Sequence, residues 1–431
     1  MSKKSTKKAT FKSETGFIVF LVISAIIAIV HFHGKGGDNI RSDGLTYYMY
    51  FQRIFLDKKL AGTGMISYPC GATLLETPFL LLTCLISKIL GLETEHGLAR
   101  QFHGAVSFAA FFYWALGISF IYRLLRKRYK QSVSLLSCIA LTLGTMLPEY
   151  VLDMSSFSHA YGFFACAAFF CYIDRYDENR GGKYVILQDA LLGLLLGLCF
   201  IVRNTNVAIG AAYLFYKVTD IKSFGLRLKK ILGLRLIPQL IAFAIPVGMQ
   251  FVLWRIMNGA WIIYSYGSQG FPYALKPQVL RVLFSDAKGL FIFCPILLVA
   301  VISMIAFRKD NPEYRVSQWV IFAAVTYFVS AWWCWWLGTA YGERMHCDIL
   351  CVFALPLAAF FDNSARAWQE SERKDNAAYV RGAVVAAYVI CVVFIALNLI
   401  FYNGCLEWKI SPNFATWYQM KNYIAEILGV K

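Results

Sequence analysis

The stretch GGDNIRSDGLTYYMYFQRIFLDKKL, residues 36–60, follows the first apolar segment and decides how the rest of the chain is interpreted. It carries three aspartates, and Asp43 stands directly before a glycine and an aromatic, amphipathic run. A carboxylate this close to a potential membrane span needs a reason, because charge is costly in lipid. Asp43 could cap a helix by accepting a backbone N–H, or it could act as a base in a reaction. Both hypotheses stay open at this point.

The composition of the whole chain indicates a membrane protein. Hydrophobic residues make up 58% of the 431 residues, and the mean hydropathy is +0.55, whereas soluble domains contain about 45–50% apolar residues. A membrane span needs about 20 apolar residues, so the chain has room for roughly ten helices. The net charge of +17 then indicates cytoplasmic loops and contact with anionic membrane lipids rather than nucleic-acid binding. We predict an all-α polytopic membrane protein.

The basic residues set the expected orientation in the membrane. Residues 1–15 form a basic tail that we place in the cytoplasm, and residues 16–32 then cross outward. Both 71–91 and 101–124 are apolar enough to span, but if both crossed, the basic cluster at 123–130 would lie outside. We therefore predict that 71–91 lies at the outer interface or dips into it. Its glutamate and internal proline are awkward in a free-standing span.

With that choice, the remaining apolar runs alternate across the bilayer and the basic loops fall on one side. The predicted transmembrane domain covers residues 16–402, with interfacial helices in a first outer loop at 33–100. A short outer tail, 403–431, carries an amphipathic cap helix near 417–428. We expect about eleven spans, at 16–32, 101–124, 132–147, 157–173, 187–202, 205–218, 234–257, 289–307, 317–337, 346–362 and 382–402.

Polar residues that topology and helix ends leave unexplained mostly fall on the outer side in this arrangement. They are Asp43, Glu76, Glu149, Asp153, His159, Arg203, Asn204, Asn206, the loop 264–288, Glu343 and Arg344. The cytoplasmic loops hold mainly ordinary lysines and arginines. We therefore expect any chemistry on the outer face.

A second acidic segment, PEYVLDMSSFSHAY, occupies residues 148–161. Asp153 could cap the following helix, and His159 could be a hydrogen-bonded core histidine. Alternatively, Asp153 faces Asp43 and helps to orient a substrate hydroxyl, since paired titratable groups often mark a site. The two aspartates could also hold a divalent ion, although the twelve cysteines show no spacing typical of a metal site.

Two arginines end apolar runs on the outer side. Arg203 in FIVRNTN could extend to the membrane interface, or it could bind a phosphate or a sugar hydroxyl together with Asn204. Arg344 follows Glu343 at the end of WWCWWLGTAYGERMH, directly before an apolar helix. The tryptophans form an aromatic belt, and an arginine at the mouth of a cavity suits bidentate phosphate binding.

Two weaker candidates come from the loops before and after residue 280. Lys288 in LRVLFSDAKGLF is a further cation that could bind phosphate, and Tyr266 in YSYGSQGFPY suits sugar stacking or ordinary loop packing. The chain contains no P-loop, GxSxG, HExxH or Rossmann fingerprint. Soluble nucleotide or hydride chemistry is therefore not expected.

The order of these segments resembles the GT-C class of integral-membrane glycosyltransferases, which take sugars from polyprenyl-phosphate donors. It is most similar to the group of protein mannosyltransferases and aminoarabinose transferases. The matching segments lie between about residues 15 and 362: SDGLTYYMYFQRIFLDKKL, YPCGATLLETPF, the SHAY loop, LCFIVRNTN, LFSDAKGLFIFCP and WWLGTAYGERMHCD. In that family the first outer loop carries the catalytic acid, which the resemblance assigns to Asp43. It also implies interfacial helices where 71–91 lies.

The resemblance implies an inverting transfer of a sugar from a polyprenyl-phosphate donor to a glycan, lipid or protein acceptor. We expect the reaction to take place at the outer face of a bacterial inner membrane and to need no cofactor. The catalytic candidates are Asp43 and Asp153. The candidates for binding the donor phosphate and the substrate are Arg344, Glu343, Arg203, His159, Asn204, Tyr266 and Lys288.

Two other functions remain open from the sequence. A transporter or flippase of polyprenyl-linked glycans would also need an apolar bundle and an outer arginine, but it predicts internal repeats and charges near mid-membrane. A non-catalytic scaffold of an envelope-assembly complex would have no use for Asp43. The tail at 403–431 is too short for the large soluble domain of some family members, so the acceptor is not specified.

Overall fold

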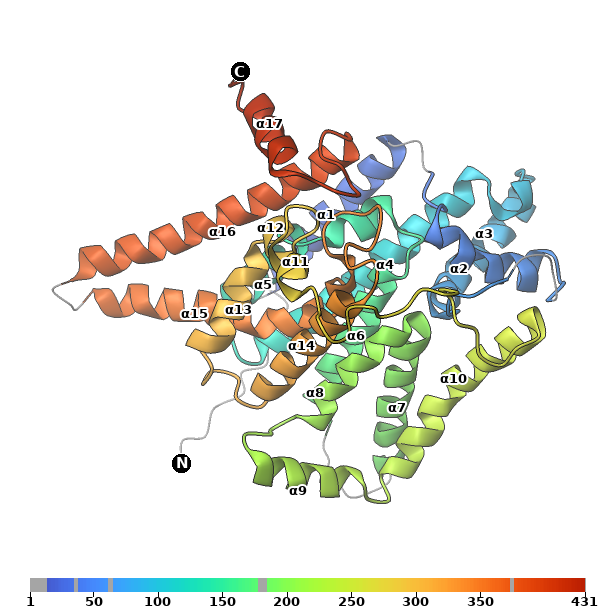
Figure 1. Ribbon diagram of the computed structural model, residues 1–431, viewed down its shortest axis with the longest axis horizontal. Helices are drawn as coiled ribbons and strands as arrows, with labels where there is room; N and C mark the ends of the chain where they lie inside the picture. The colour runs from blue at the N-terminus through green and yellow to red at the C-terminus, as the bar shows by residue number, and fades with distance from the viewer. Residues whose placement is uncertain (1–13, 35–37, 61–64, 177–183, 373–375, 431) are drawn as a thin grey trace.

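Figure 1 shows a computed structural model of the chain, which describes residues 14–34, 38–60, 65–176, 184–372 and 376–430. Most of the predicted basic tail lies outside these residues. The described residues form helices and turns without a strand. The helices are α1 (Thr15–Gly34), α2 (Asp43–Phe51), α3 (Gly71–Leu90), α4 (Arg100–Arg126), α5 (Gln131–Leu143), α6 (His159–Ile173), α7 (Val185–Val202), α8 (Ala211–Leu214), α9 (Ile221–Ile231), α10 (Leu236–Asn258), α11 (Val279–Phe284), α12 (Leu290–Phe293), α13 (Ile296–Ala306), α14 (Arg315–Ala331), α15 (Ala354–Ser371), α16 (Ala377–Leu406) and α17 (Trp417–Ile427).

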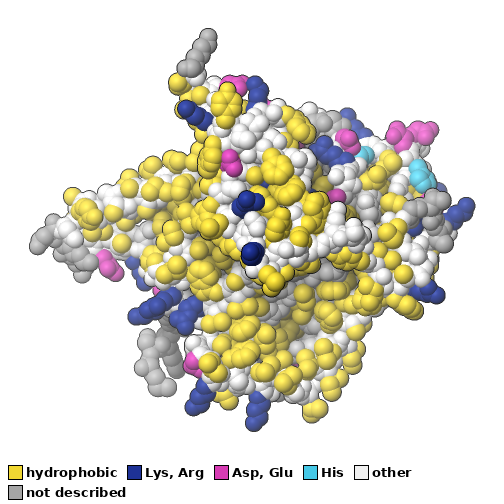
Figure 2. Space-filling model, in the orientation of Figure 1, with side chains coloured by type: hydrophobic (Ala, Val, Ile, Leu, Met, Phe, Trp, Pro, Cys, Tyr) yellow, Lys and Arg dark blue, Asp and Glu magenta, His cyan; other side chains and the backbone are white. Residues whose placement is uncertain are grey.

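The predicted fold class, an all-α polytopic membrane protein, is confirmed. In the described part of the chain, seven helical segments are long and apolar enough to cross a membrane, and three shorter apolar helices accompany them. Hydrophobic side chains cover much of the molecular surface, including the outward faces of α10 and α16 (Figure 2). A helix satisfies all its backbone hydrogen bonds internally, so such a surface can face lipid.

Three of the predicted spans are not continuous helices. The span at 205–218 is a 3-10 segment, Asn204–Gly210, followed by the short α8. The span at 289–307 is broken between α12 and α13, because Pro295 lacks a backbone N–H. The span at 346–362 begins with two 3-10 turns before α15. Irregular backbone at membrane depth is tolerated where it is buried in protein or lines a cavity, and these breaks lie beside candidate site residues.

The start of α1 and the end of α4 lie on the same face of the molecule. Glu14, directly before α1, pairs with Arg126 at 3.4 Å and accepts a hydrogen bond from Tyr122. The two helices therefore run antiparallel across the bundle. If both cross the membrane, the chain between them must begin and end on the same side.

The packing of α3 against α4 is consistent with a chain between α1 and α4 that begins and ends on the same side. By length and composition α3 could span, but Phe79 at its middle contacts the rings of Phe108 and Phe112, with centroids 5.6 and 5.4 Å away. Near its end, Ser87 accepts a hydrogen bond from Gln101 at 3.4 Å. These contacts set α3 antiparallel beside the first half of α4. By length and composition α3 remains a candidate span, so its position at the outer interface stays a prediction.

Packing against α6 fixes the position of α2. Within α2, a Cβ on Gly44 would lie 1.8 Å from the Oγ of Ser156, so only glycine allows this approach. Tyr47 then donates a hydrogen bond to Ser158 at 3.1 Å. The Asp-Gly pair that the sequence presents is therefore held against the segment that leads into α6.

This topology predicts that the segments before and after α3 lie on the same side of the membrane. A cysteine at Glu93 should react with a membrane-impermeant thiol reagent from the same side as a cysteine at Lys276. A cysteine at Lys127 should react only from the other side. The half-buried Cys84 and Cys334 are replaced by serine for this experiment. Labelling of Glu93→Cys from the side opposite to Lys276→Cys would contradict a position of both ends of α3 on one side of the membrane.

Candidate active site

A cavity of about 560 Å³ opens among the segments that follow α7, α10 and α14. Its wall is mostly aromatic and apolar, and Arg203 and Arg344 supply its positive charge. The lining residues are Tyr47, Tyr68, Pro69, Arg203, Asn204, Thr205, Ile263, Tyr264, Ser265, Tyr266, Gln269, Phe271, Phe328, Val329, Trp332, Trp333, Cys334, Leu337, Gly338, Arg344 and Met345. A groove of similar volume, about 570 Å³, lies between α15 and α16. Its wall is almost entirely apolar, so it suits lipid chains rather than chemistry.

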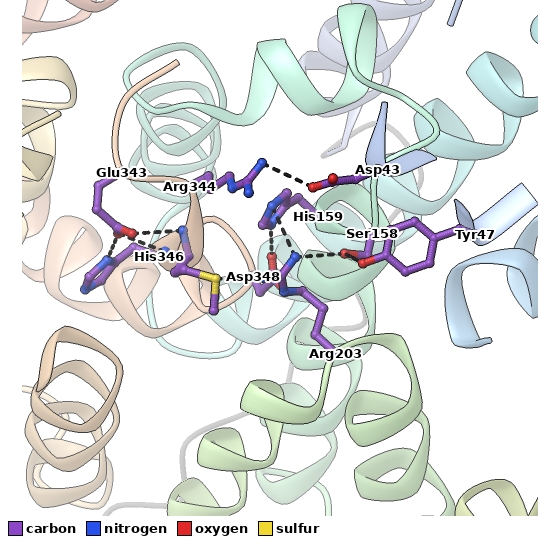
Figure 3. A network of polar contacts seen from close by, with 10 residues as sticks. Asp43, Tyr47, Ser158, His159, Arg203, Glu343, Arg344, His346 and Asp348 are labelled. Atoms are coloured by element: carbon purple, nitrogen blue, oxygen red, sulfur yellow. Dashed lines mark hydrogen bonds and ion pairs between the residues drawn. The ribbon is translucent and has the colours of Figure 1, made fainter. Parts of the chain in front are cut away.

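The carboxylate of Asp43 lies beside this cavity and faces the guanidinium of Arg344. Their nearest atoms, Oδ2 and Nη1, are 3.5 Å apart, and Tyr68 donates a hydrogen bond to Oδ1 at 3.4 Å. About a third of the Asp43 side chain is exposed. The helix-cap hypothesis does not describe this residue, because Asp43 is the first residue of α2 and Ser42 occupies the cap position. The carboxylate therefore points toward the arginine (Figure 3).

The turn that carries Arg344 is held by a buried carboxylate. Glu343 accepts hydrogen bonds from the backbone amides of Met345 at 3.1 Å and His346 at 3.2 Å, and it also contacts the His346 imidazole. The other imidazole nitrogen lies 3.0 Å from the hydroxyl of Thr326 on α14. Burial alone would raise the pKa of Glu343, but His346 and the two amides outweigh it and lower the pKa. Glu343, a predicted substrate ligand, is placed to fix the Arg344 turn.

Arg203 is the centre of a second, more buried network (Figure 3). Its guanidinium donates to the Ser158 hydroxyl at 3.1 Å and to the Met345 sulfur at 2.8 Å. It also lies 3.4 Å from Nε2 of His159, whose Nδ1 lies 2.7 Å from Asp348. These contacts are satisfied together when His159 is neutral and carries its proton on Nδ1. The structure thus brings Arg203 and His159 together, although His159 itself is fully buried.

Asp348 is the part of this site that the sequence reasoning did not single out. It contacts His159 and lies 3.8 Å from the Nε of Arg203. Its side chain is 1% exposed, and an isolated charge so deeply buried would be costly without these partners. A Cβ on Gly162 of α6 would lie 2.3 Å from the carboxylate, so a glycine provides the space. The sequence signal that could have identified Asp348 is an acid two residues after His346, inside an otherwise apolar run.

Asp153 does not share these partners. Its carboxylate lies 2.9 Å from the His31 imidazole on α1 and accepts a hydrogen bond from Tyr402 on α16, while its backbone carbonyl accepts one from Arg41. It therefore joins α1 and α16 rather than completing a pair with Asp43. Across the described residues, no group of three or more His, Cys, Asp or Glu side chains is placed to hold a metal ion.

Asn204 and Tyr266 both line the cavity. The Asn204 amide donates to the Phe200 carbonyl at 3.2 Å, so the side chain stays near the end of α7. The ring of Tyr266 lies edge-on to Trp332, with centroids 5.0 Å apart. Together with its neighbours, Tyr266 forms part of the aromatic lining of the cavity.

Lys288 lies in the protein interior, away from the cavity wall. Its side chain is 1% exposed and donates to the backbone carbonyls of Ala340 and Pro412. The Pro412 carbonyl also accepts the Ala340 amide at 2.8 Å, and Phe414 packs on Trp336 with centroids 4.9 Å apart. Burial lowers the pKa of Lys288 to about 8. This lysine joins the C-terminal segment to the loop that leads to Arg344.

Comparisons with known proteins identify the fold. A scan of protein-family models finds no match, and neither does a search of curated proteins. Among solved structures, ArnT from Cupriavidus metallidurans bound to undecaprenyl phosphate matches with a TM-score of 0.50 and 13% identity, and the match covers 91% of this chain and 72% of that one. Its apo structure matches with a TM-score of 0.51 and 12% identity over the same shares. ArnT is an aminoarabinose transferase of the GT-C class. The GT-C-like fold that the sequence resemblance implied is therefore confirmed.

The position of Lys288 predicts a structural role near the site. Lys288→Met should leave two buried carbonyls with fewer donors and destabilise the protein by about 1–3 kcal/mol. The C-terminal segment should also become more sensitive to proteolysis. Thermal unfolding and limited proteolysis of the purified protein measure both effects, and Lys276→Met, at an exposed lysine, is the control. Unchanged stability together with lost ligand binding would instead favour direct substrate contact by Lys288.

Proposed function

We propose that this integral membrane protein transfers a sugar from a polyprenyl-phosphate donor to an acceptor at the membrane face where the cavity opens. The observation that carries the proposal is the carboxylate of Asp43, 3.5 Å from the guanidinium of Arg344, beside a cavity that also contains Arg203. A base and a phosphate-binding cation are the two groups that this reaction needs. The shared fold with ArnT, which has been solved with undecaprenyl phosphate bound, supports the class of donor.

The cavity suits both halves of such a donor. Arg344 and Arg203 can bind the phosphate, since guanidinium groups form paired hydrogen bonds with phosphate oxygens. The buried Nε of Arg344 has no hydrogen-bond partner among the described residues, so it can still donate one. The aromatic wall, which includes Tyr266 and Trp332, offers flat apolar surfaces to a sugar ring or to the first isoprene units.

The reaction follows from these positions. Asp43 accepts the proton of an acceptor hydroxyl while that oxygen attacks the anomeric carbon of the donor sugar. The bond from the anomeric carbon to the phosphate oxygen breaks, and the phosphate leaves with the electron pair. Arg344 and Arg203 stabilise the charge that develops on the leaving phosphate. A single displacement of this kind inverts the anomeric centre.

The contact between Asp43 and Arg344 couples donor binding to catalysis. Without a donor, Arg344 pairs with the Asp43 carboxylate at 3.5 Å. A phosphate in the cavity would compete for the same guanidinium and draw it away from Asp43. The carboxylate would then be released to act as a base only when a donor is present, which limits unproductive hydrolysis.

We place this chemistry on the periplasmic side of a bacterial inner membrane, because the opposite face carries the basic helix ends. The acceptor is a glycan, lipid or protein hydroxyl. The scheme uses no metal ion. Asp153, the predicted partner of Asp43, has its own contacts with His31 and Tyr402, so we assign it a structural role.

A transporter and a non-catalytic scaffold make different predictions. A flippase would move a polyprenyl-linked glycan without releasing polyprenyl phosphate, and a scaffold would do neither. The purified protein is therefore incubated in liposomes with a panel of labelled undecaprenyl-phosphate sugars and candidate acceptors. Release of undecaprenyl phosphate together with labelled product supports transfer. Movement of label across the bilayer without release supports the flippase.

In this assay, Asp43→Asn should abolish transfer, with a loss of at least about a hundredfold, while the binding of undecaprenyl phosphate is retained. Asn keeps the shape of the side chain but cannot accept the proton. Asp57→Asn, which alters an exposed acid of the same outer loop, is the matched control. Both proteins are assayed with and without EDTA, and equal rates are expected because no metal takes part. Full activity of Asp43→Asn would refute the assignment of the base.

Replacement of Arg344 should mainly affect the donor. Arg344→Gln should weaken the binding of undecaprenyl phosphate by about 10- to 100-fold, since a hydrogen bond to a charged group contributes about 1.5–3 kcal/mol. Arg344→Lys should restore only part of this binding, because an ammonium cannot form the paired contact. Binding is measured by titration of the detergent-solubilised protein, with Arg255→Gln as the control. Unchanged affinity in Arg344→Gln would exclude a phosphate contact.

A further inference from the structure

The helix α9 lies on the face of the molecule opposite the cavity. It precedes α10, and Arg235, directly before α10, forms an ion pair at 2.9 Å with Asp189 near the start of α7. The other end of α7 leads to Arg203, and the chain after α10 leads to the cavity residues at 263–271. In Figure 1, α9 lies below α8, and its end adjoins the lower end of α10. It is therefore positioned at the basic, cytoplasmic boundary of the bundle.

The rotation of α9 about its own axis is fixed by the rest of the protein. Asp220 and Ser223 form a capping box at its start. The ring of Phe224 stacks on Phe215, with centroids 5.1 Å apart. The guanidinium of Arg227 donates to the backbone carbonyl of Tyr213 at 2.6 Å. One face of α9 is thus bound to the end of α8, and its other faces point outward in a defined direction.

An exposed apolar stripe follows one of these outward faces. Ile221 is 91% exposed, Leu228 36% and Leu232 66%, and their spacing of seven and four residues places them on one side of the helix. Leu226, 63% exposed, lies off this stripe. Lys222 and Lys229, both exposed, each follow a stripe residue by one position. They therefore form a basic row about 100° further round the helix.

This pattern fits a membrane surface. A well-anchored helix facing water would gain nothing from exposing three large aliphatic side chains, whereas the boundary between headgroups and acyl chains accepts them. The adjacent row of lysines would then lie at headgroup level, where anionic phospholipids attract them. Figure 2 shows Lys and Arg side chains beside hydrophobic ones at the lower edge of the molecule, over α9.

We infer that α9 is an interfacial lipid-binding helix, which recognises anionic phospholipid headgroups through Lys222 and Lys229 while Ile221, Leu228 and Leu232 enter the acyl-chain boundary. The site lies on the far side of the bundle from the cavity, and it does not depend on the proposed transfer reaction. Its ligand class is an anionic glycerophospholipid such as phosphatidylglycerol.

The test places a fluorescent reporter on the stripe. Leu232→Cys is introduced into the full-length protein with Cys84 and Cys334 replaced by serine, labelled with bimane and reconstituted into nanodiscs. The discs contain phosphatidylcholine and phosphatidylglycerol, and the bromine quencher is placed on the acyl chains of one lipid or the other at equal fraction. Brominated phosphatidylglycerol should quench more strongly than brominated phosphatidylcholine. The preference should fall by about fivefold for each lysine in Lys222→Gln and Lys229→Gln.

A double variant at Lys59 and Lys421, both exposed lysines outside α9, removes the same charge and should leave the preference unchanged. Equal quenching by the two lipids in the protein with both α9 lysines would overturn the headgroup site, and so would a preference that survives their removal. An absence of quenching by either lipid would overturn the interfacial position of α9 and would point to a water-soluble protein partner for this face.

Discussion

The buried contact among Arg203, His159 and Asp348 is the interaction on which the rest of the site depends. The Asp348 side chain is 1% exposed, within a bundle that is largely apolar. A carboxylate in such surroundings is stable only with charged or hydrogen-bonding partners. Those partners come from the start of α6 and the end of α7, while Asp348 itself follows the turn that carries Arg344. Because the buried acid needs these partners, its contacts hold three segments together and fix the position of Arg203, one of the two cavity arginines.

The interruptions in the helices are explained by the need to direct charged side chains into the cavity. A continuous helix satisfies its own backbone groups and presents side chains only to its sides, so it cannot direct an arginine from its end into a cavity. The 3-10 segment at Asn204–Gly210 and the turn at Arg344–His346 end the regular backbone next to the two arginines of the site. Glu343 then satisfies two of the backbone amides that such a turn exposes. Irregular backbone therefore lies where it lines the cavity or is buried, as the membrane environment requires.

The two faces of the protein are organised by different physical demands. On the cavity side, charged groups are few and precisely partnered, as with Asp43 and Arg344. On the opposite side, Arg128 bridges Asp174 and Glu313 at the helix ends, and α9 combines an apolar stripe with lysines. Partnered charges can shape a reaction site in a low dielectric, while a row of lysines at a membrane surface would be attracted by an anionic leaflet.

The sequence by itself determined the class of fold, the positions of most long helices, and the candidates Asp43, Arg203 and Arg344, because hydropathy and abrupt charge are local properties of the chain. It did not predict α9 and α11, which lie between its predicted spans, or the breaks around α8 and α12. It could not determine which polar residues meet. Asp153 and Lys288 carry the same kinds of charge and the same predicted outer positions as these candidates, yet the structure places them against His31, Tyr402 and two backbone carbonyls. Asp348 was not assigned a role because its partners are 145 and 189 residues away. Only the tertiary structure decided these pairings, since the compensation of a buried charge depends on distances in space, which a linear pattern does not contain.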